Sequence, residues 1–151
     1  MARMESKKEL LHSDISEAII GCCFEVMTDL GAGFLENVYK NALFIAMRQK
    51  GLNVLAEQSF EVMFRGSKIG KYVADLIVEN AIVVELNCCT VLLPEHKAQV
   101  INYLKASGIP VGLLINFGQQ KLEYKRLHHP NNEAEKLRQR IHLLLASNEN
   151  S

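Results

Sequence analysis

Two carboxylates interrupt the most apolar part of the sequence. Asp75 lies within residues 72–78 and Glu85 within residues 82–86, and the other residues of both segments are apolar or aromatic. An ionised carboxylate in a buried strand is unfavourable unless it is paired with a cation or bound to a metal. Carboxylate oxygens are hard ligands that suit Mg²⁺ or Mn²⁺. The pattern favours a divalent-cation site over its alternative, a pair of strand-end acids neutralised by nearby Lys or Arg.

The turn between the two segments decides whether these acids share a face. If residues 79–81 form a three-residue loop, Val78 pairs with Ile82, and Asp75 lies directly opposite Glu85. Opposed residues on neighbouring strands have Cβ atoms about 5 Å apart, so two like charges there repel unless a cation lies between them. A two-residue turn at 79–80 would place the acids on opposite faces. A metal site requires the three-residue loop.

Polar residues on two expected helices can join these acids. Glu36 and Tyr39 are three residues apart, Gln99 and Tyr103 are four apart, and His96 precedes Gln99 by about one turn. Residues at these spacings share a helix face. Each residue alone is more typical of a solvated face or a satisfied core, and His96 is more typical of an exposed polar residue than of a ligand. Taken together with Asp75 and Glu85, however, these residues indicate one functional site.

The elements that must position these residues alternate between helical and extended patterns. Apolar spacing predicts a first helix from Ser13 or Asp14, with Asp14 and Glu17 forming a capping box. A second helix is expected over 34–50, because Gly51 is a typical C-terminal glycine. Strands are expected at 60–64, 69–78, 81–86, 110–117 and 122–127, with helices over 94–108 and from about residue 132. The predicted fold is α/β, a mixed central sheet flanked by helices in the order α-α-β-β-β-α-β-β-α.

Length and composition limit the class of protein. The 151 residues fit one domain over 1–151, with 1–12 and 148–151 as flexible ends. The 17 Lys and Arg balance 17 Asp and Glu, which excludes a uniformly basic, histone-like coat but not a local basic patch. The sequence has no run of about 20 apolar residues for a membrane helix, and its N-terminus does not resemble a signal peptide. The four cysteines form two adjacent pairs, which we interpret as four reduced, buried thiols of a cytoplasmic protein.

Basic residues are modestly concentrated in the C-terminal fifth of the chain. They can form a phosphate-binding edge, because nucleic-acid affinity comes chiefly from Lys and Arg at phosphates. A solvated strand edge and helix face fits the same pattern equally well. The residues concerned are Lys121, Lys125, Arg126, Lys136, Arg138 and Arg140.

Several motifs occur in a fixed order along nearly the whole chain. Residues 33–39 read Gly-x-x-Glu-x-x-Tyr, and later segments read YVAD (72–75), VEL (84–86), AQVINYLK (98–105) and GLLINFG (112–118). In this combination the chain resembles the GxxExxY proteins, small prokaryotic proteins assigned to the PD-(D/E)xK nuclease superfamily. The resemblance implies a restriction-endonuclease-like core and metal-assisted hydrolysis of phosphodiester bonds in nucleic acid, with DNA as the first expectation.

The resemblance also implies roles for particular residues. Asp75 and Glu85 match the metal-binding acids of the superfamily, and Glu36 resembles the additional acid that many members carry on a helix. A Mg²⁺ or Mn²⁺ ion would be held by these acids and by the Leu86 carbonyl, and would activate water and offset charge on the phosphate. Gln99 and Tyr103 match the QxxxY helix that lies beside the active site of RecB-type nucleases.

One position departs from the superfamily pattern. The lysine expected two residues after the second acid is Asn87 in this chain. An amide forms hydrogen bonds but carries no charge. Losing a charged group aimed at the transition state costs on the order of 10²–10³-fold in rate. An ammonium from elsewhere can compensate, and the candidates are Lys71, Lys97 and Lys105.

Three hypotheses therefore remain open from the sequence. The first is a metal-dependent nuclease with Glu36, Asp75, Glu85, Asn87, Gln99 and Tyr103 at its active site. The second is a catalytically degenerate nuclease fold that binds nucleic acid or protein. The third is a fold used only for protein association, in which the acids form a structural network.

Overall fold

Three helices form where apolar residues recur three and four positions apart. In the computed structural model, which describes residues 11–130 and 144–145, the helices are α2 (Ser13–Leu30), α3 (Glu36–Gln49) and α4 (Pro94–Ser107). Gly31 ends α2 and Gly108 ends α4, with φ angles of 71° and 76° that glycine adopts without strain. None of the described helices is long and apolar enough to cross a membrane.

The predicted capping box at the start of α2 is wrong. The N-cap is His12 in a left-handed conformation, and it makes no side-chain cap. Asp14 already lies inside the first turn, so its side chain cannot act as the cap. The Ser16 hydroxyl instead donates to the His12 carbonyl at 3.2 Å.

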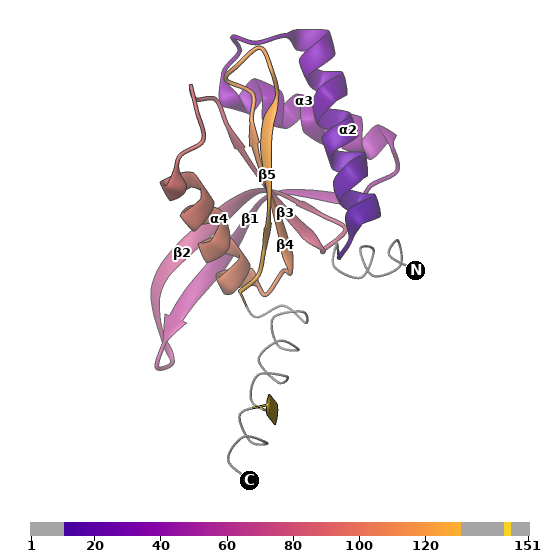
Figure 1. The fold of residues 1–151 in the computed structure, drawn as a ribbon. Helices are drawn as coiled ribbons and strands as arrows, with labels where there is room; N and C mark the ends of the chain where they lie inside the picture. Colours follow the sequence, from indigo (N-terminus) through magenta and orange to yellow (C-terminus); the bar gives the residue numbers. More distant parts are fainter. Residues whose placement is uncertain (1–10, 131–143, 146–151) are drawn as a thin grey trace.

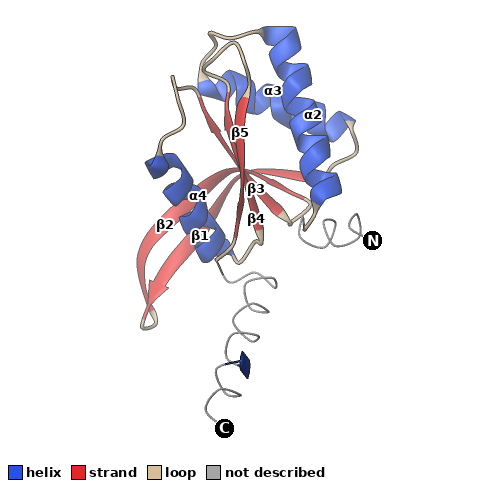
Figure 2. Cartoon of the chain, in the orientation of Figure 1, coloured by secondary structure: helices blue, strands red, loops and turns tan. Residues whose placement is uncertain are grey.

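Five strands form one sheet in the order β1-β2-β3-β4-β5 (Figures 1 and 2). They are β1 (Val54–Phe64), β2 (Ser67–Val78), β3 (Ile82–Asn87), β4 (Val111–Asn116) and β5 (Glu123–His128). Only the β3–β4 pair is parallel, and α4 provides the crossover between those two strands. β1 and β2 extend beyond the rest of the sheet as a two-stranded arm (Figure 1). The mixed α/β architecture is confirmed; the helix expected from residue 132 lies outside the described residues, except that Leu144 and Leu145 are helical and exposed.

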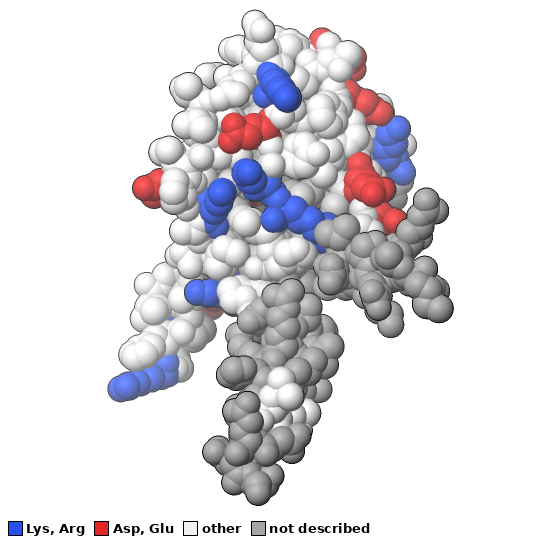
Figure 3. Space-filling model, in the orientation of Figure 1, with Lys and Arg blue, Asp and Glu red and all other residues white. Residues whose placement is uncertain are grey.

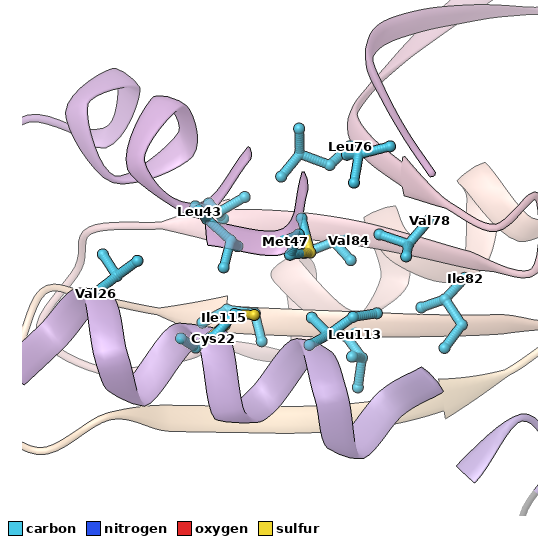
Figure 4. Packing of buried hydrophobic residues seen from close by; sticks show 14 of the residues in the cluster. Cys22, Val26, Leu43, Met47, Leu76, Val78, Ile82, Val84, Leu113 and Ile115 are labelled. Carbon is cyan, nitrogen blue, oxygen red and sulfur yellow. The ribbon is translucent and has the colours of Figure 1, made fainter. Parts of the chain in front are cut away.

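Helices cover both faces of this sheet. α2 and α3 pack on one face, where Cys22, Leu43 and Met47 meet Val84 and Leu113 in the larger apolar core (Figure 4). α4 packs on the other face against alternate residues of the same strands, in the smaller core. Because successive strand residues point to opposite faces, neighbouring positions of β3 and β4 belong to different cores.

The contact between α4 and the sheet is close at one glycine. A Cβ atom at Gly112 of β4 would lie 2.5 Å from the Val100 side chain of α4. Such a distance is impossible without a shift, so the absence of a side chain at residue 112 lets the helix approach the sheet. This approach brings the polar residues of α4 near the ends of β2 and β3.

Candidate active site

The turn between β2 and β3 has the predicted register. Val78 pairs with Ile82, and the three residues between them form the turn. Glu79 and Asn80 both adopt φ 53°, and the Glu79 carboxylate accepts a hydrogen bond from the backbone N–H of Asn53 at 2.7 Å. The three-residue loop is therefore confirmed, and Asp75 lies at the level of Glu85.

The two acids join the strands where the regular ladder stops. The last regular pair is Leu76 with Val84. Beyond it, the Asp75 N–H donates to Glu85 Oε1 at 2.9 Å, and the Leu86 N–H donates to Asp75 Oδ2 at 2.9 Å. Each carboxylate thus replaces a backbone carbonyl of the neighbouring strand. Asp75 Oδ1 and Glu85 Oε2 take no part in these two bonds.

All six predicted site residues line one cavity on the α4 face of the sheet. Its volume is about 210 Å³. The acids come from the start of α3, from β2 and from β3, and the amide and phenol come from α4. The lining residues are Glu36, Asp75, Glu85, Leu86, Asn87, His96, Gln99, Val100, Tyr103 and Leu114. We call this cavity the acid pocket.

The acid pocket brings together one buried, one half-buried and one exposed carboxylate, those of Glu85, Asp75 and Glu36. Glu85 is only 9% exposed, and burial, with a further contribution from the charge of Asp75, raises its pKa to about 9. Burial and the charge of Asp75 also raise the pKa of Glu36. The ion pairs found among the described residues involve none of these three acids. The pocket therefore contains carboxylates without a directly paired cation.

This donor set fits a divalent metal ion, with two acids as the main ligands. No group of three His, Cys, Asp or Glu side chains in the described part of the chain is already arranged to hold a metal. Mg²⁺ is usually bound by one or two carboxylates and keeps several waters. Asp75 and Glu85, joined through their backbone bonds, supply those two carboxylates. The predicted three-acid metal set remains a prediction.

The polar side chains of α4 have distinct roles around the acid pocket. The Gln99 amide donates to the Tyr103 hydroxyl at 3.1 Å, so the two residues make contact as their spacing predicts. The Tyr103 ring is 5% exposed and meets the Tyr72 ring edge-on, with centroids 5.1 Å apart. His96 Nδ1 accepts the Leu93 N–H at 2.9 Å, which caps the start of α4. His96 therefore serves as a cap of α4 at the rim of the pocket.

A family model provides the deciding comparison. The model for the PD-(D/E)XK nuclease superfamily matches residues 13–127, which include every element from α2 to β4 and nearly all of β5. The chain belongs to this superfamily. No curated protein matches the chain.

The chain is also similar to two solved structures. The crystal structure of SSO0001 has a TM-score of 0.51 and 23% identity, and the match covers 74% of this chain and 58% of that one. This chain therefore spans little more than half the length of SSO0001. An alkaline exonuclease from Laribacter hongkongensis (LHK-Exo) has a TM-score of 0.49 and 10% identity, with 93% of this chain and 82% of that chain covered.

Tyr39, expected near the acids of this nuclease-like site, lies in the core instead. It is 0% exposed, and its ring stacks on Phe117 with centroids 4.7 Å apart. Its hydroxyl donates to the Gly31 carbonyl at 2.5 Å and accepts the Phe34 N–H at 3.2 Å. Tyr39 therefore holds the segment that precedes α3, and it positions Glu36 at the first turn of that helix.

The lysine expected after the second acid is not replaced within the pocket by any of the predicted candidates. None of Lys71, Lys97 and Lys105 lines the acid pocket. Lys105 instead lines a second groove, beside α4 and the β1–β2 arm. Another cation, Lys40, lies one turn after Glu36 on α3, and its Nζ lies 2.7 Å from Glu57 Oε1. Its spacing of four residues from Glu36 was a usable signal that sequence reasoning missed.

Asn116 is a second residue that sequence reasoning missed. Its side chain is fully buried at the end of β4 and accepts the N–H groups of Cys89 and Gly118 at 3.0 and 2.9 Å. It also donates to the Cys89 carbonyl at 2.9 Å. Asn116 thus fixes the chain that leaves β3 directly after Asn87. The signal was present, because a polar residue interrupts an apolar strand there just as Asp75 does.

The prediction of four buried thiols is wrong for the second pair. Cys22 and Cys23 are buried in the larger core, but Cys88 is exposed and Cys89 is half-buried. The second pair follows the end of β3, where the chain leaves the covered sheet. Burial and the charge of Glu36 raise the pKa of the Cys88 thiol, so this cysteine lies within reach of the pocket's electric field.

The basic C-terminal patch is described only in part. Figure 3 shows a group of Lys and Arg side chains near the middle of the viewed face. Lys125 is exposed on β5, but Arg126 bonds to the Ser16 hydroxyl and the Leu11 carbonyl and is partly withdrawn from solvent. Lys136, Arg138 and Arg140 lie outside the described residues.

Proposed function

We propose that this protein is a divalent-metal-dependent nuclease-like enzyme that hydrolyses phosphodiester bonds in nucleic acid, DNA in the first instance. The observation that carries the proposal is the bridging of β2 and β3 by Asp75 and Glu85 inside one pocket. Two carboxylates held this close together, one of them buried, cannot both ionise readily unless a cation lies near them. Membership of the nuclease superfamily supports the same chemistry.

The residues assigned to the metal are Asp75 and Glu85, with the Leu86 carbonyl and Glu36 completing the set. When bound, Mg²⁺ or Mn²⁺ lowers the pKa of a coordinated water and offsets charge on a phosphate. Glu85 holds a proton in the metal-free protein at neutral pH, because burial raises its pKa to about 9. It must release that proton to serve as a ligand.

The phenol of Tyr103 supplies a hydrogen-bond donor to the substrate. Its oxygen already accepts the Gln99 amide, so its own proton is directed to another acceptor. Burial and the charge of Glu85 raise the pKa of Tyr103, so the phenol keeps its proton at neutral pH. A phosphate oxygen in the acid pocket is the acceptor we assign to it.

The Gly-x-x-Glu-x-x-Tyr motif receives a physical explanation, which supports our proposal that the chain is a GxxExxY protein. Gly33 adopts φ 110°, a value that other residues rarely adopt. Glu36 follows at the first position of α3 and lines the acid pocket. Tyr39 holds the turn through its hydroxyl. Gly33 and Tyr39 thus fix the backbone before and within the start of α3, and this positions the Glu36 carboxylate at the acid pocket.

A second candidate function is binding of nucleic acid without cleavage. Asn87 favours it, since the pocket lacks the charged group that superfamily members aim at the phosphate. An uncharged amide lowers the expected rate by about 10²–10³-fold. The acid pocket would then bind a cation and a phosphate without turnover.

A cleavage assay tests the proposal and separates the two candidates. Purified protein is incubated with plasmid, linear and single-stranded DNA and with RNA, in Mg²⁺ or Mn²⁺. We expect slow cleavage that Asp75→Asn reduces by at least about 10²-fold, since loss of groups that merely support metal ligands already costs 10–100-fold. The amide at residue 75 keeps an acceptor for the Leu86 N–H. Asp29→Asn, an exposed change on α2, is the matched control.

Asn87→Lys decides what an inactive wild type means. If the wild type is inert and Asn87→Lys cleaves, the protein is a binding module with a repairable site. If neither protein cleaves any substrate with either metal, the proposed enzymatic function is wrong.

A further inference from the structure

Lys40 forms a largely covered ion pair on the helix that carries Glu36. Its Nζ contacts Glu57 Oε1 at 2.7 Å, and its side chain is 12% exposed while that of Glu57 is 64% exposed. It lies on α3 four residues after Glu36, and this spacing places the two side chains on one helix face. A lysine this covered is held in one place by its surroundings, unlike the mobile lysines of a free surface.

Glu57 brings this lysine to the level of the acids. The β1–β2 pairs Ala56 with Leu76 and Gln58 with Ala74 flank Glu57, which therefore lies opposite Asp75 on the neighbouring strand. Glu57 also adopts φ 54°, an uncommon conformation for a residue with a Cβ, and such conformations persist where the surrounding structure imposes them. The ion pair thus forms at the strand position that adjoins Asp75.

The neighbouring strand, β2, is also irregular, at Asp75. Leu76 packs in the core under α2 and α3, whereas Ala74 packs in the core under α4. Residues two apart in a regular strand share a face, so β2 changes its orientation at Asp75. At this position the Asp75 carboxylate lines the acid pocket, and Glu57 on the neighbouring strand contacts Lys40 of α3.

The charge of Lys40 interacts with the pocket. The hydrogen bond to Glu57 raises the pKa of Lys40, and the charges of Asp75 and Glu36 raise it further. Among the described Lys and Arg residues whose pKa is raised, Lys40 is the one influenced by these two acids. No described lysine lines the pocket itself, so Lys40 acts on it through its charge from the neighbouring α3–β1 contact.

We propose that Lys40, fixed by Glu57, supplies the positive charge that Asn87 lacks. This inference rests on the proposed function and assigns Lys40 as a positioning and electrostatic residue that acts on a phosphate bound at the acid pocket. The competing explanation is a purely structural tie between α3 and β1. Both explanations predict weaker cleavage when Lys40 is replaced, but they differ in the sign of the effect on metal affinity and in whether Asn87→Lys restores cleavage.

The experiment compares Lys40→Met with Lys50→Met, a matched control in which another lysine paired with a glutamate is removed at the far end of the same helix. Mn²⁺ affinity is measured by calorimetry and kcat by cleavage of DNA. We expect Lys40→Met to bind Mn²⁺ about three- to tenfold more tightly, because a nearby repelling charge is gone. We expect its kcat to fall by about 10-fold or more, because the charge that offsets the phosphate is also gone. Lys50→Met should change neither quantity.

Two further variants exclude a structural effect. Lys40→Arg keeps the charge and should retain most of the activity. Asn87→Lys placed in the Lys40→Met protein should restore cleavage, because it returns a cation to the pocket from β3. A structural tie predicts that metal affinity and cleavage fall together and that Asn87→Lys does not rescue them.

Each outcome decides the inference. Unchanged affinity and unchanged cleavage in Lys40→Met overturn it while leaving the proposed function intact. If the wild type binds Mn²⁺ but cleaves nothing, the proposed function fails. A tighter Mn²⁺ affinity in Lys40→Met, without a change in Lys50→Met, would then still support a charge directed at the pocket. If the wild type neither binds the metal nor cleaves, both proposals are wrong.

Discussion

The two faces of the sheet use the same strands for different purposes. On the face covered by α2 and α3, Leu76, Val84 and Leu113 form a continuous apolar core. On the face covered by α4, Asp75 and Glu85 occupy the positions adjacent to two of these residues and line a polar cavity. The difference shows that one strand can provide stability through alternate residues and chemistry through the residues between them. The apolar face keeps the strands rigid, and the acids gain fixed positions.

The largest expected effect comes from core truncations on either face. Leu113 and Leu114 are adjacent on β4, nearly fully buried, and point to opposite faces. Changing either to Ala should lower the free energy of unfolding by about 2–5 kcal/mol, measured by urea denaturation. Only Leu114→Ala should also alter Mn²⁺ affinity, since Leu114 lines the acid pocket. An equal change of Mn²⁺ affinity in both variants would contradict the claim that only the α4 face of the sheet contributes to metal binding.

The pH dependence of stability sharpens the comparison. The pKa of Glu85 is about 9 in the folded protein against about 4.5 for a fully solvated glutamate, so the folded state binds one more proton than the unfolded state between these pH values. The contribution of Glu85 to the free energy of unfolding is complete below about pH 4.5. It falls as pH rises towards 9, by at most about 1.4 kcal/mol per pH unit. Urea denaturation in EDTA should show this decline in the wild type and a flatter profile in Glu85→Gln. Parallel profiles would mean that Glu85 is not the titrating group.

A smaller effect is expected at the edge of the acid pocket. Asn116→Ala leaves the Cys89 N–H and carbonyl without their side-chain partner, which should cost about 1–3 kcal/mol of stability. It should also loosen the segment after β3, so that a thiol reagent labels Cys88 faster than in the wild type. Unchanged labelling would show that this segment is held by other contacts.

The sequence predicted the parts of the fold that depend on local pattern. Pro94 and Gly108 gave the limits of α4 to within one residue, because each has a backbone preference that acts at a helix end. The apolar residues of β3 predicted a covered central strand, and the acids within β2 and β3 predicted the pocket. The hairpin register followed from counting residues through the turn.

Features that depend on distant contacts were missed. β1 begins at Val54, six residues before the predicted start, because pairing with β2 imposes strand geometry on a polar segment. The Lys40–Glu57 contact joins α3 to β1, and no local pattern reports which strand a helix side chain will meet. Tyr39 shares a helix face with the polar residue Glu36, yet its ring stacks on Phe117, a residue distant in the sequence.

Calorimetric titration of Mn²⁺ into the metal-free protein tests the central claim, that the α4 face carries a divalent-cation site. We predict one binding site in the wild type, with release of a proton at neutral pH as Glu85 becomes a ligand. Asp75→Asn and Glu85→Gln should abolish this binding, and the surface variant Asp29→Asn should bind as the wild type does. Absence of binding to the wild type, or equal affinity in Asp75→Asn, would contradict the account.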